Sequence, residues 1–219
     1  MVRYILVGVL CTAILSCRDI QRFQDTTSIQ GYQLNGTVTT PNGVPIEQVD
    51  VRLYYDYDFV SDSPSDTQQV AVTASLSLVD VAVYTVKYEF VRQIFFDYRT
   101  TGTVPRYRWN GRDRNGNVVP SGKYLIRYVV DTTIIKYSPW LVEGHSTDTT
   151  DTRGGFTLTS DRLPVGDVFD LYDSFNVYIG TYKVLPSIDI EFVKSSQTAT
   201  YGNIALQKDI ITGRTFILQ

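Results

Sequence analysis

The chain has 219 residues, of which 43% are hydrophobic, and a formal net charge of −3. This length allows one large or two small domains with a sizeable core, and the hydrophobic fraction excludes wholesale disorder. Lys and Arg are scattered rather than clustered, which disfavours a nucleic-acid partner, because binding phosphates requires grouped cations. The apolar set includes 16 Tyr and 10 Phe but one Met. With the many Val, Ile and Thr residues, this favours an all-β fold.

The N-terminal segment MVRYILVGVLCTAILSC has the features of an export signal. Arg3 precedes an apolar run over residues 4–15, which is shorter than the about 20 residues of a membrane-spanning helix. The run ends in Ile14-Leu15-Ser16-Cys17, which resembles the bacterial lipobox. The resemblance implies a signal peptide over residues 1–16, cleavage before Cys17, and a lipid anchor on Cys17 that holds the chain to the membrane. The alternative is an ordinary signal peptide with an incidental Cys.

The two cysteines, Cys11 and Cys17, would leave the mature chain without a disulfide, because one is removed and the other carries lipid. Polar residues 17–30 lack alternation and are expected to form a tether between the lipid and the first strand. Arg18, rather than Asp, after the Cys favours the outer membrane by the enterobacterial sorting pattern. We therefore expect a lipid-anchored protein of the bacterial cell envelope, at the outer membrane.

Residues 31–60 begin a series of short alternating segments. Leu34, Gly36 and Val38 share one face, Pro41-Asn42-Gly43 forms a turn, and Val49, Val51 and Leu53 alternate with polar residues. This pattern predicts two strands joined by a short connection.

These residues resemble the opening of the carboxypeptidase regulatory-like domain, a small β-sandwich. The family's usual continuation occurs much later, at Thr150–Leu158 (TDTRGGFTL) and Leu163–Gly166 (LPVG). The resemblance implies a sandwich split between residues 31–60 and 146–219, with the interval inserted in a loop. In its last part, Thr212-Gly213 is expected to turn a final hairpin, and Phe216-Ile217-Leu218 to pair into a sheet.

Between these halves, residues 61–69 (SDSPSDTQQ) have the composition of a linker. Residues 70–131 then resemble the Ig-like domain of the flagellar hook-capping protein FlgD, a module of many exported bacterial proteins. The resemblance is carried by four matching segments: Val81-Ala82-Val83-Tyr84, Trp109-Asn110-Gly111-Arg112-Asp113, Asn115-Gly116, and Pro120-Ser121-Gly122-Lys123-Tyr124. The family has Asp where this chain has Asn110. Because the flanks differ and a lipobox is present, we expect the module and not hook capping itself.

The stretch from Arg108 to Tyr124 (RWNGRDRNGNVVPSGKY) has two interpretations. Asp113, Asn115 and Asn117 stand at alternate positions, as at the start of a calcium loop. However, Val118, Val119 and Pro120 occupy the places where further ligands are needed, so calcium is a weak candidate.

The second interpretation is a turn. Asp113 can accept backbone N–H groups, Asn115-Gly116 and Gly122 tolerate positive φ, and Pro120 fixes its own φ. Trp109 would close the end of the sandwich, with its indole N–H on a loop carbonyl. We assign six residues to this structural turn: Trp109, Gly111, Asp113, Gly116, Pro120 and Gly122.

Catalytic signals are weak. His145 is the only histidine, and no Ser or Cys stands in a nucleophile motif. Asp148 and Asp151 could pair as acid and base, but an Asp- and Thr-rich loop before a strand favours a solvated turn. Aromatic residues 54–59 (YYDYDF) could stack on sugar rings, although strand faces explain them as well. No Gly-rich phosphate loop and no cofactor motif is present.

The expected function is that of a non-enzymatic, lipid-anchored structural or protein-binding module, with other envelope proteins as partners. The alternative is a carbohydrate-binding or uptake accessory lipoprotein. A hydrolase built on Asp148 and Asp151 is the third hypothesis. The module expectation depends on analogy to accessory domains, because a fold alone does not specify a function.

Overall fold

The computed structural model describes residues 29–173, 175 and 177–219. Within these residues the chain is all-β, with strands and no helix, which confirms the predicted fold class. The strands are β1 (Gln33–Thr39), β2 (Asp50–Ser61), β3 (Val70–Val72), β4 (Ser77–Thr85), β5 (Phe90–Arg99), β6 (Gly102–Val104), β7 (Gly122–Val130), β8 (Thr133–Val142), β9 (Ser146–Thr149), β10 (Gly155–Leu158), β11 (Val168–Tyr172), β12 (Tyr178–Lys194), β13 (Gln197–Ala205) and β14 (Ile211–Ile217).

One unit, here called the host sandwich, consists of β1, β2 and β9 to β14. Its two sheets have the orders β10-β1-β14 and β11-β12-β2-β9, with β13 added to β12. Alternate residues of the strands point inward, so that Val51, Leu53, Ile190 and Phe192 are fully buried. The inward side chains of both sheets form one core. This unit therefore contains both ends of the described chain.

The second unit, here called the inserted module, consists of β3 to β8. It has a sheet of order β5-β4-β7-β8 and a small sheet β3-β6. Val79, Val81 and Val83 of β4 lie in a separate core with Ile126 and Trp109. The four-stranded sheet continues past residue 131, because β8 pairs with β7 from Gly122↔Val142 to Val130↔Thr133.

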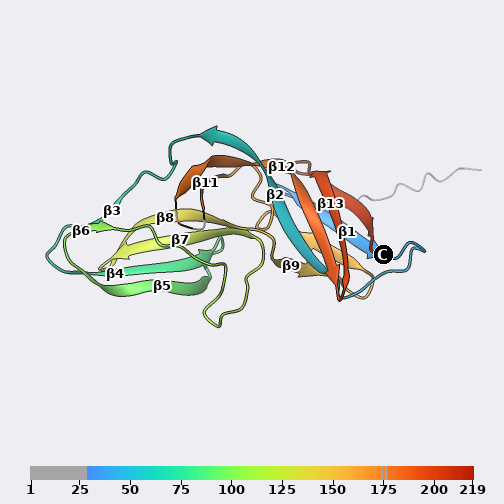
Figure 1. Ribbon diagram of the computed structural model, residues 1–219, viewed down its shortest axis with the longest axis horizontal. Helices are drawn as coiled ribbons and strands as arrows, with labels where there is room; N and C mark the ends of the chain where they lie inside the picture. The colour runs from blue at the N-terminus through green and yellow to red at the C-terminus, as the bar shows by residue number, and fades with distance from the viewer. Residues whose placement is uncertain (1–28, 174, 176) are drawn as a thin grey trace, which may run out of the picture.

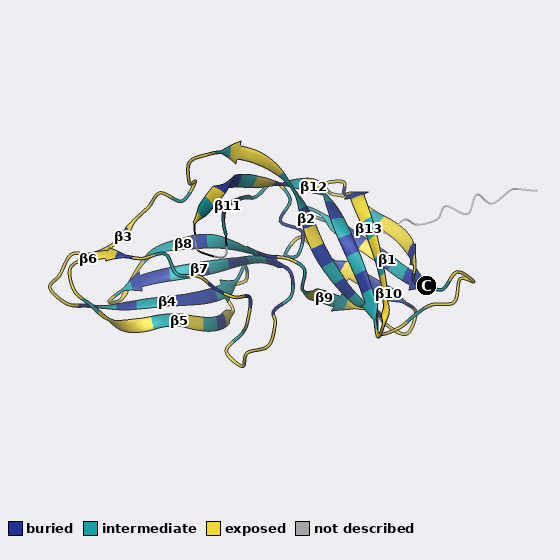
Figure 2. Cartoon of the chain, viewed as in Figure 1, coloured by how far each residue is buried: buried dark blue, intermediate teal, exposed yellow. Residues whose placement is uncertain are grey.

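The two units lie end to end along the long axis of the molecule (Figure 1), with β1 and β13 toward one end and β3 and β6 toward the other. The chain leaves the host sandwich after β2 and returns to it at β9. The core residues of each unit appear as dark bands along the strands in Figure 2.

The strands β1 and β2 are consecutive but belong to different sheets. The turn between them is closed by Thr40, which bonds Gly43 and Val44 through backbone groups. β1 then pairs with β10 and β14, whereas β2 pairs with β12 and β9. The short connection predicted from the sequence thus crosses from one layer of the sandwich to the other.

The final hairpin predicted at Thr212-Gly213 is wrong, because both residues lie inside β14. β14 pairs in parallel with β1, from Gln33↔Ile211 to Thr39↔Ile217, and Gly213 lies opposite Asn35. The chain passes from β13 in one sheet to β14 in the other, and this change of sheet needs a longer connection than a hairpin turn. Residues 206–210 provide that connection. The expectation that the last apolar residues pair into a sheet is confirmed, with Phe216 buried.

Candidate functional site

The stretch from Arg108 to Tyr124 forms a compact loop that leads into β7. Trp109 is 5% exposed and meets Tyr124 edge to face at 4.9 Å between ring centroids. Its indole Nε1 donates to the carbonyl oxygen of Arg112 at 2.7 Å. Gly111 and Gly116 have φ of 68° and 87°, in the left-handed region that favours glycine. The loop thus contributes a buried aromatic residue to the core of the inserted module.

Asp113 organises the tip of this loop. Its Oδ1 accepts the backbone N–H groups of Asn115 and Asn117, both at 2.8 Å, and its Oδ2 accepts the side-chain amide of Asn117 at 3.2 Å. Desolvation acts against the charged form, but hydrogen bonds from Asn117, Asn115 and Gly116 outweigh it and lower the pKa of Asp113. The carboxylate is therefore stabilised by donors of its own loop.

The side chains of Asp113, Asn115 and Asn117 are not all oriented as oxygen ligands of a calcium ion. The Asn117 amide turns its N–H toward Asp113, so one of the three candidates acts as a donor and not as an oxygen ligand. Within residues 29–173, 175 and 177–219 no group of three or more His, Cys, Asp or Glu side chains could hold a metal ion. The structure favours the turn interpretation of this stretch.

The loop also contacts the host sandwich through His145. The ring Nδ1 of His145 lies 2.9 Å from the carbonyl oxygen of Val119, and its backbone N–H donates to Ser121 Oγ at 3.0 Å. A Cβ atom placed on Gly111 would lie 2.8 Å from His145 Cε1. The only histidine of the sequence is thus part of the junction between the two units, and no sequence pattern indicates this role.

The linker of residues 61–69 is held at the same junction. Asp170 of β11 accepts the backbone N–H groups of Ser65 and Asp66 at 2.8 and 3.0 Å, and the hydroxyl of Thr181 at 2.6 Å. The Asp66 carboxylate in turn accepts Lys136 Nζ of β8 at 2.9 Å. The segment with the composition of a flexible linker is therefore attached to both units.

Further contacts join the units on other sides. Lys123 of β7 forms a salt bridge of 2.7 Å with Asp167, and Arg106 stacks over the ring of Tyr172 at 3.8 Å. Gly144 donates its N–H to the carbonyl oxygen of Leu53 at 2.7 Å. Because these contacts surround the junction, they oppose bending of one unit against the other.

Asp148 and Asp151 are occupied by backbone donors. Asp148 accepts the N–H of Thr157 at 3.0 Å, and Asp151 accepts the N–H groups of Arg153 and Gly155 at 2.8 Å each. The bonds from Gly155 and Arg153 lower the pKa of Asp151. A lowered pKa disfavours a general acid at neutral pH. Asp151 is thus a structural turn residue, as predicted, whereas the turn predicted at Asp148 is wrong, because Asp148 lies in β9 and bonds to β10.

The aromatic residues 54–59 do not all face the same way, because Tyr54 is 37% exposed whereas the neighbouring Tyr55 is buried at 5%. Tyr57 and Phe59 both contact Tyr182 edge to face. The Tyr55 hydroxyl donates to the carbonyl oxygen of Arg162 at 2.7 Å, and the Tyr57 hydroxyl donates to Glu143 at 2.7 Å. Burial, followed by the nearby Glu143 carboxylate, raises the pKa of both phenols. Phe59 is half exposed.

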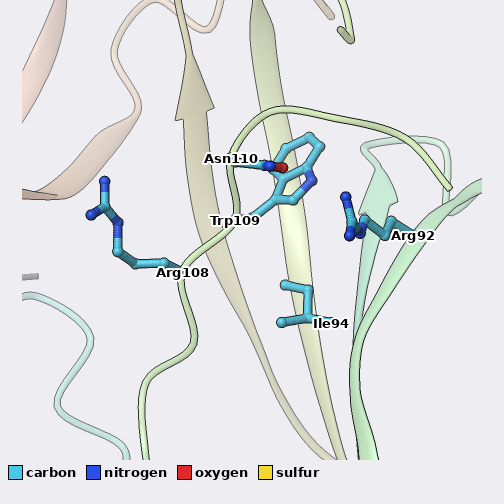
Figure 3. Close-up of a pocket in the computed structure, with 5 residues that line it drawn as sticks. All are labelled: Arg92, Ile94, Arg108, Trp109 and Asn110. Atoms are coloured by element: carbon cyan, nitrogen blue, oxygen red, sulfur yellow. The ribbon is translucent and has the colours of Figure 1, made fainter. Parts of the chain in front are cut away.

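An open recess of about 340 Å³ lies between β5 and the loop, lined by Arg92, Ile94, Arg108, Trp109 and Asn110. Figure 3 shows the side chain of Arg92 beside the indole and that of Arg108 directed away from it. The lining holds no carboxylate, thiol or imidazole, and the indole is almost fully buried. The recess offers a cation and an amide but no nucleophile or general base.

The inserted module exposes aromatic side chains on the outward side of its four-stranded sheet, here called the outer aromatic face. Phe96, Tyr98 and Phe90 of β5 are 58%, 61% and 50% exposed. Register places Phe96 beside Asp80 and Tyr98 beside Leu78, on the side opposite to the core valines of β4. Across the sheet, Tyr137 of β8 meets Tyr88 of the β4–β5 turn edge to face at 5.6 Å. Sequence reasoning missed this face, although apolar residues at both parities of β5 (FVRQIFFDYR) signal it.

No family model matches the chain, and neither the curated proteins nor the solved structures contain a match to it. The resemblances to the regulatory-like and hook-capping Ig-like domains stay predictions. The predicted signal peptide of residues 1–16, the predicted lipidation site Cys17 and most of the predicted tether lie outside the described residues. In the part of the chain that is described, no helix is long and apolar enough to cross a membrane.

Proposed function

We propose that the protein is a non-enzymatic, lipid-anchored component of the bacterial cell envelope, in which the host sandwich serves as a base and the inserted module binds protein. The observation that carries this proposal is the junction, where hydrogen bonds and salt bridges attach the linker and the loop to both units. A junction of this kind holds a binding module in a fixed orientation relative to its base, which a flexible linker does not.

The order of the units along the molecule supports this role. The first described strand, β1, belongs to the host sandwich, so a tether from Cys17 would join the protein through the host sandwich. The inserted module extends along the long axis away from β1 (Figure 1) and carries the outer aromatic face. Exposed aromatic residues are enriched where proteins bind one another.

The absence of enzymatic activity is supported by the state of the acidic side chains. Asp113 and Asp151 each accept hydrogen bonds from backbone N–H groups of their own turns, and Asp148 of β9 accepts the backbone N–H of Thr157 in β10. His145 is engaged by Val119 and Ser121. A general base must be able to reach a substrate proton, and these groups are committed to loop geometry.

Glycan binding is the second candidate, favoured by the exposed Tyr and Phe side chains. Sugar rings stack on aromatic faces but also need free polar partners for their hydroxyl groups. On the outer aromatic face Asp80 bonds to two neighbouring side chains: it accepts Gln93 Nε2 at 3.1 Å and Arg127 at 3.0 Å. This arrangement favours an apolar protein surface over a glycan.

The anchor is tested by intact mass and membrane partition of the chain expressed in a bacterium, with Cys17→Ala as the variant. We expect wild type to be cleaved before Cys17, to carry acyl chains, and to fractionate with outer membranes, whereas Cys17→Ala stays uncleaved or leaves that fraction. An unlipidated wild-type chain would contradict the anchor and its envelope location.

The binding role is tested separately with a photoreactive amino acid at Tyr98. We expect protein adducts from Tyr98 in living cells and few adducts from Phe175, which is 85% exposed on the host sandwich. Equal labelling from both positions, or none from Tyr98, would contradict protein binding by the inserted module.

A further inference from the structure

We propose that the outer aromatic face is a self-association surface, on which two copies of the chain pack their four-stranded sheets face to face. The inference rests on the proposed protein-binding role and names the partner as a second copy.

The face departs from the usual pattern of an antiparallel sheet, in which the outward side is polar. Outward positions of β5 carry Phe90, Phe96 and Tyr98, and each is at least half exposed. On β8, Ile134 is 50% and Tyr137 is 37% exposed on the same side of the sheet. Figure 2 shows β5 exposed over much of its length. An apolar surface of this kind, left in water, favours burial against another surface.

The charges of the face are neutralised within the chain. Arg127 and Asp80 form a salt bridge of 3.0 Å, and Arg127 lies over the ring of Tyr84 at 4.5 Å. The Nε of Arg127 has no hydrogen-bond partner among the described residues and is buried, so a ligand cannot reach it. A copy of the same face therefore meets no unpaired charge, whereas an acidic or basic partner would gain nothing from it.

The edge of the sheet is less suited to association than its face. β5 and β8 are the two edge strands of the sheet. The register of β5 with β4 shifts at two places, and that of β8 with β7 shifts at one place. Bulges interrupt the regular row of N–H and C=O groups that an added strand needs. Pairing of two copies edge to edge is thus disfavoured, which leaves packing of face on face, the arrangement of the layers in a sandwich.

The direction of the strands suits a pair of anchored copies. The strands of the four-stranded sheet run along the long axis of the molecule (Figure 1). If the host sandwich faces the membrane, the outer aromatic face stands parallel to the membrane normal. A two-fold axis along that normal joins the faces of two copies while both anchors point to the same membrane, and such isologous contacts are the commonest in homo-oligomers.

The test is the mass of the full-length chain in solution. Wild type is purified from bacterial membranes in detergent, or without detergent from the medium if the chain proves to be unlipidated, and studied by sedimentation velocity over a range of concentrations. We expect a dimer. Phe96→Glu should weaken the dimer by about 30-fold or more, as expected of an aromatic residue at the centre of an interface.

Phe175→Glu is the matched control, because it removes an exposed phenyl ring from the host sandwich, and it should leave the dimer intact. Near-ultraviolet circular dichroism checks that the variants fold, and Tyr98→Glu replaces Phe96→Glu if the latter does not. A monomer in the wild type at about 100 μM, or equal loss of dimer in the Phe175→Glu control, overturns the inference. So does a monomer that binds a glycan or another protein through this face. A lipidated monomer would contradict the proposed self-association but not the lipid anchor. An unlipidated dimer would contradict the lipid anchor but not the self-association.

Discussion

The ammonium group of Lys136 lies 2.9 Å from both carboxylate oxygens of Asp66, and both side chains are largely withdrawn from solvent, at 14% and 17% exposure. Lys136 also donates to the carbonyl oxygen of Gln68 at 2.6 Å. Lys136 of β8 thus binds two residues, Asp66 and Gln68, of the linker between β2 and β3. The linker is thereby part of the inserted module's surface and cannot swing freely.

Replacing Lys136 with Met should lower the free energy of unfolding by on the order of 3 kcal/mol, because Asp66 would be left as a nearly buried, unpaired charge. Urea unfolding measures the change. Lys87→Met is the control: Lys87 is 70% exposed and 3.6 Å from Asp161, so its loss should cost less than about 0.5 kcal/mol. Equal changes in the free energy of unfolding for the two variants would show that the ion pair of Lys136 stabilises the fold no more than an exposed one.

Gly111→Ala should destabilise the chain more than Gly116→Ala, although both glycines have positive φ. A Cβ on Gly116 meets nothing within 4 Å, whereas one on Gly111 meets His145 Cε1 at 2.8 Å. The imidazole cannot move freely, because Val119 holds it. We expect a cost of about 1–2 kcal/mol for Gly116→Ala, from backbone strain alone, and at least about 1 kcal/mol more for Gly111→Ala.

The double variant Gly111→Ala with His145→Ala separates the steric contact from the strain. In the His145→Ala background the imidazole is absent, so Gly111→Ala should lower the free energy of unfolding only by as much as Gly116→Ala does in wild type. If the excess persists without the ring, the contact with His145 is not its cause.

Trp109→Phe should lower stability by about 1–3 kcal/mol, because the carbonyl oxygen of Arg112 loses its indole donor in a nearly buried site. Chemical unfolding followed by circular dichroism measures the loss. The sequence has two tryptophans, so the variant also assigns fluorescence: the remaining emission should be that of Trp140. A stability equal to wild type would mean that water replaces the indole N–H without cost.

The lowered pKa of Asp170 leads us to expect a loss of stability in acid. Burial alone would raise its pKa, but hydrogen bonds from Thr181, Asp66 and Ser65 outweigh burial, so the pKa in the folded chain is lowered. The unfolded chain then takes up the proton first as the pH falls. The contribution of Asp170 is therefore complete above the ordinary carboxyl pKa of about 4 and is lost as the pH falls from there through the folded-state pKa.

Asp170→Asn isolates this contribution, because the other carboxylates titrate alike in both proteins. The variant should be less stable than wild type at pH 7, and the difference should narrow steadily between about pH 5 and pH 2. Urea unfolding at a series of pH values provides the curves. A difference that stays constant over this range would assign the effect of the variant to packing and not to charge.

Local patterns predicted the elements better than their partners. The alternation of Val49, Val51 and Leu53 gave the buried face of β2, and that of Val79, Val81 and Val83 the buried face of β4. Both patterns report only which side of a strand is inward. The parallel pairing of β1 with β14 depends on residues at opposite ends of the sequence, and a Thr-Gly pair that resembles a turn lies inside that ladder.

The loop and the junction show the same limit. Asp113, Gly116 and Trp109 could be interpreted from nearby residues, because an Asx turn, a positive φ and an indole bond all act within a few positions. The roles of His145, Asp66 and Asp170 could not, since each acts on a segment far away in the sequence. A polar composition identified residues 61–69 as a connection but did not reveal that tertiary contacts fix it.

The pairing of β14 with β1 has a consequence for biosynthesis. As the chain emerges from the ribosome, β1 appears first of the described strands, but its parallel neighbour β14 appears last of them. The inserted module, whose ladders are complete by Val142, can fold meanwhile. The host sandwich keeps one edge of β1 unpaired until β14 has been made. A truncation that removes Ile211 to Ile217 therefore deprives β1 of its parallel partner.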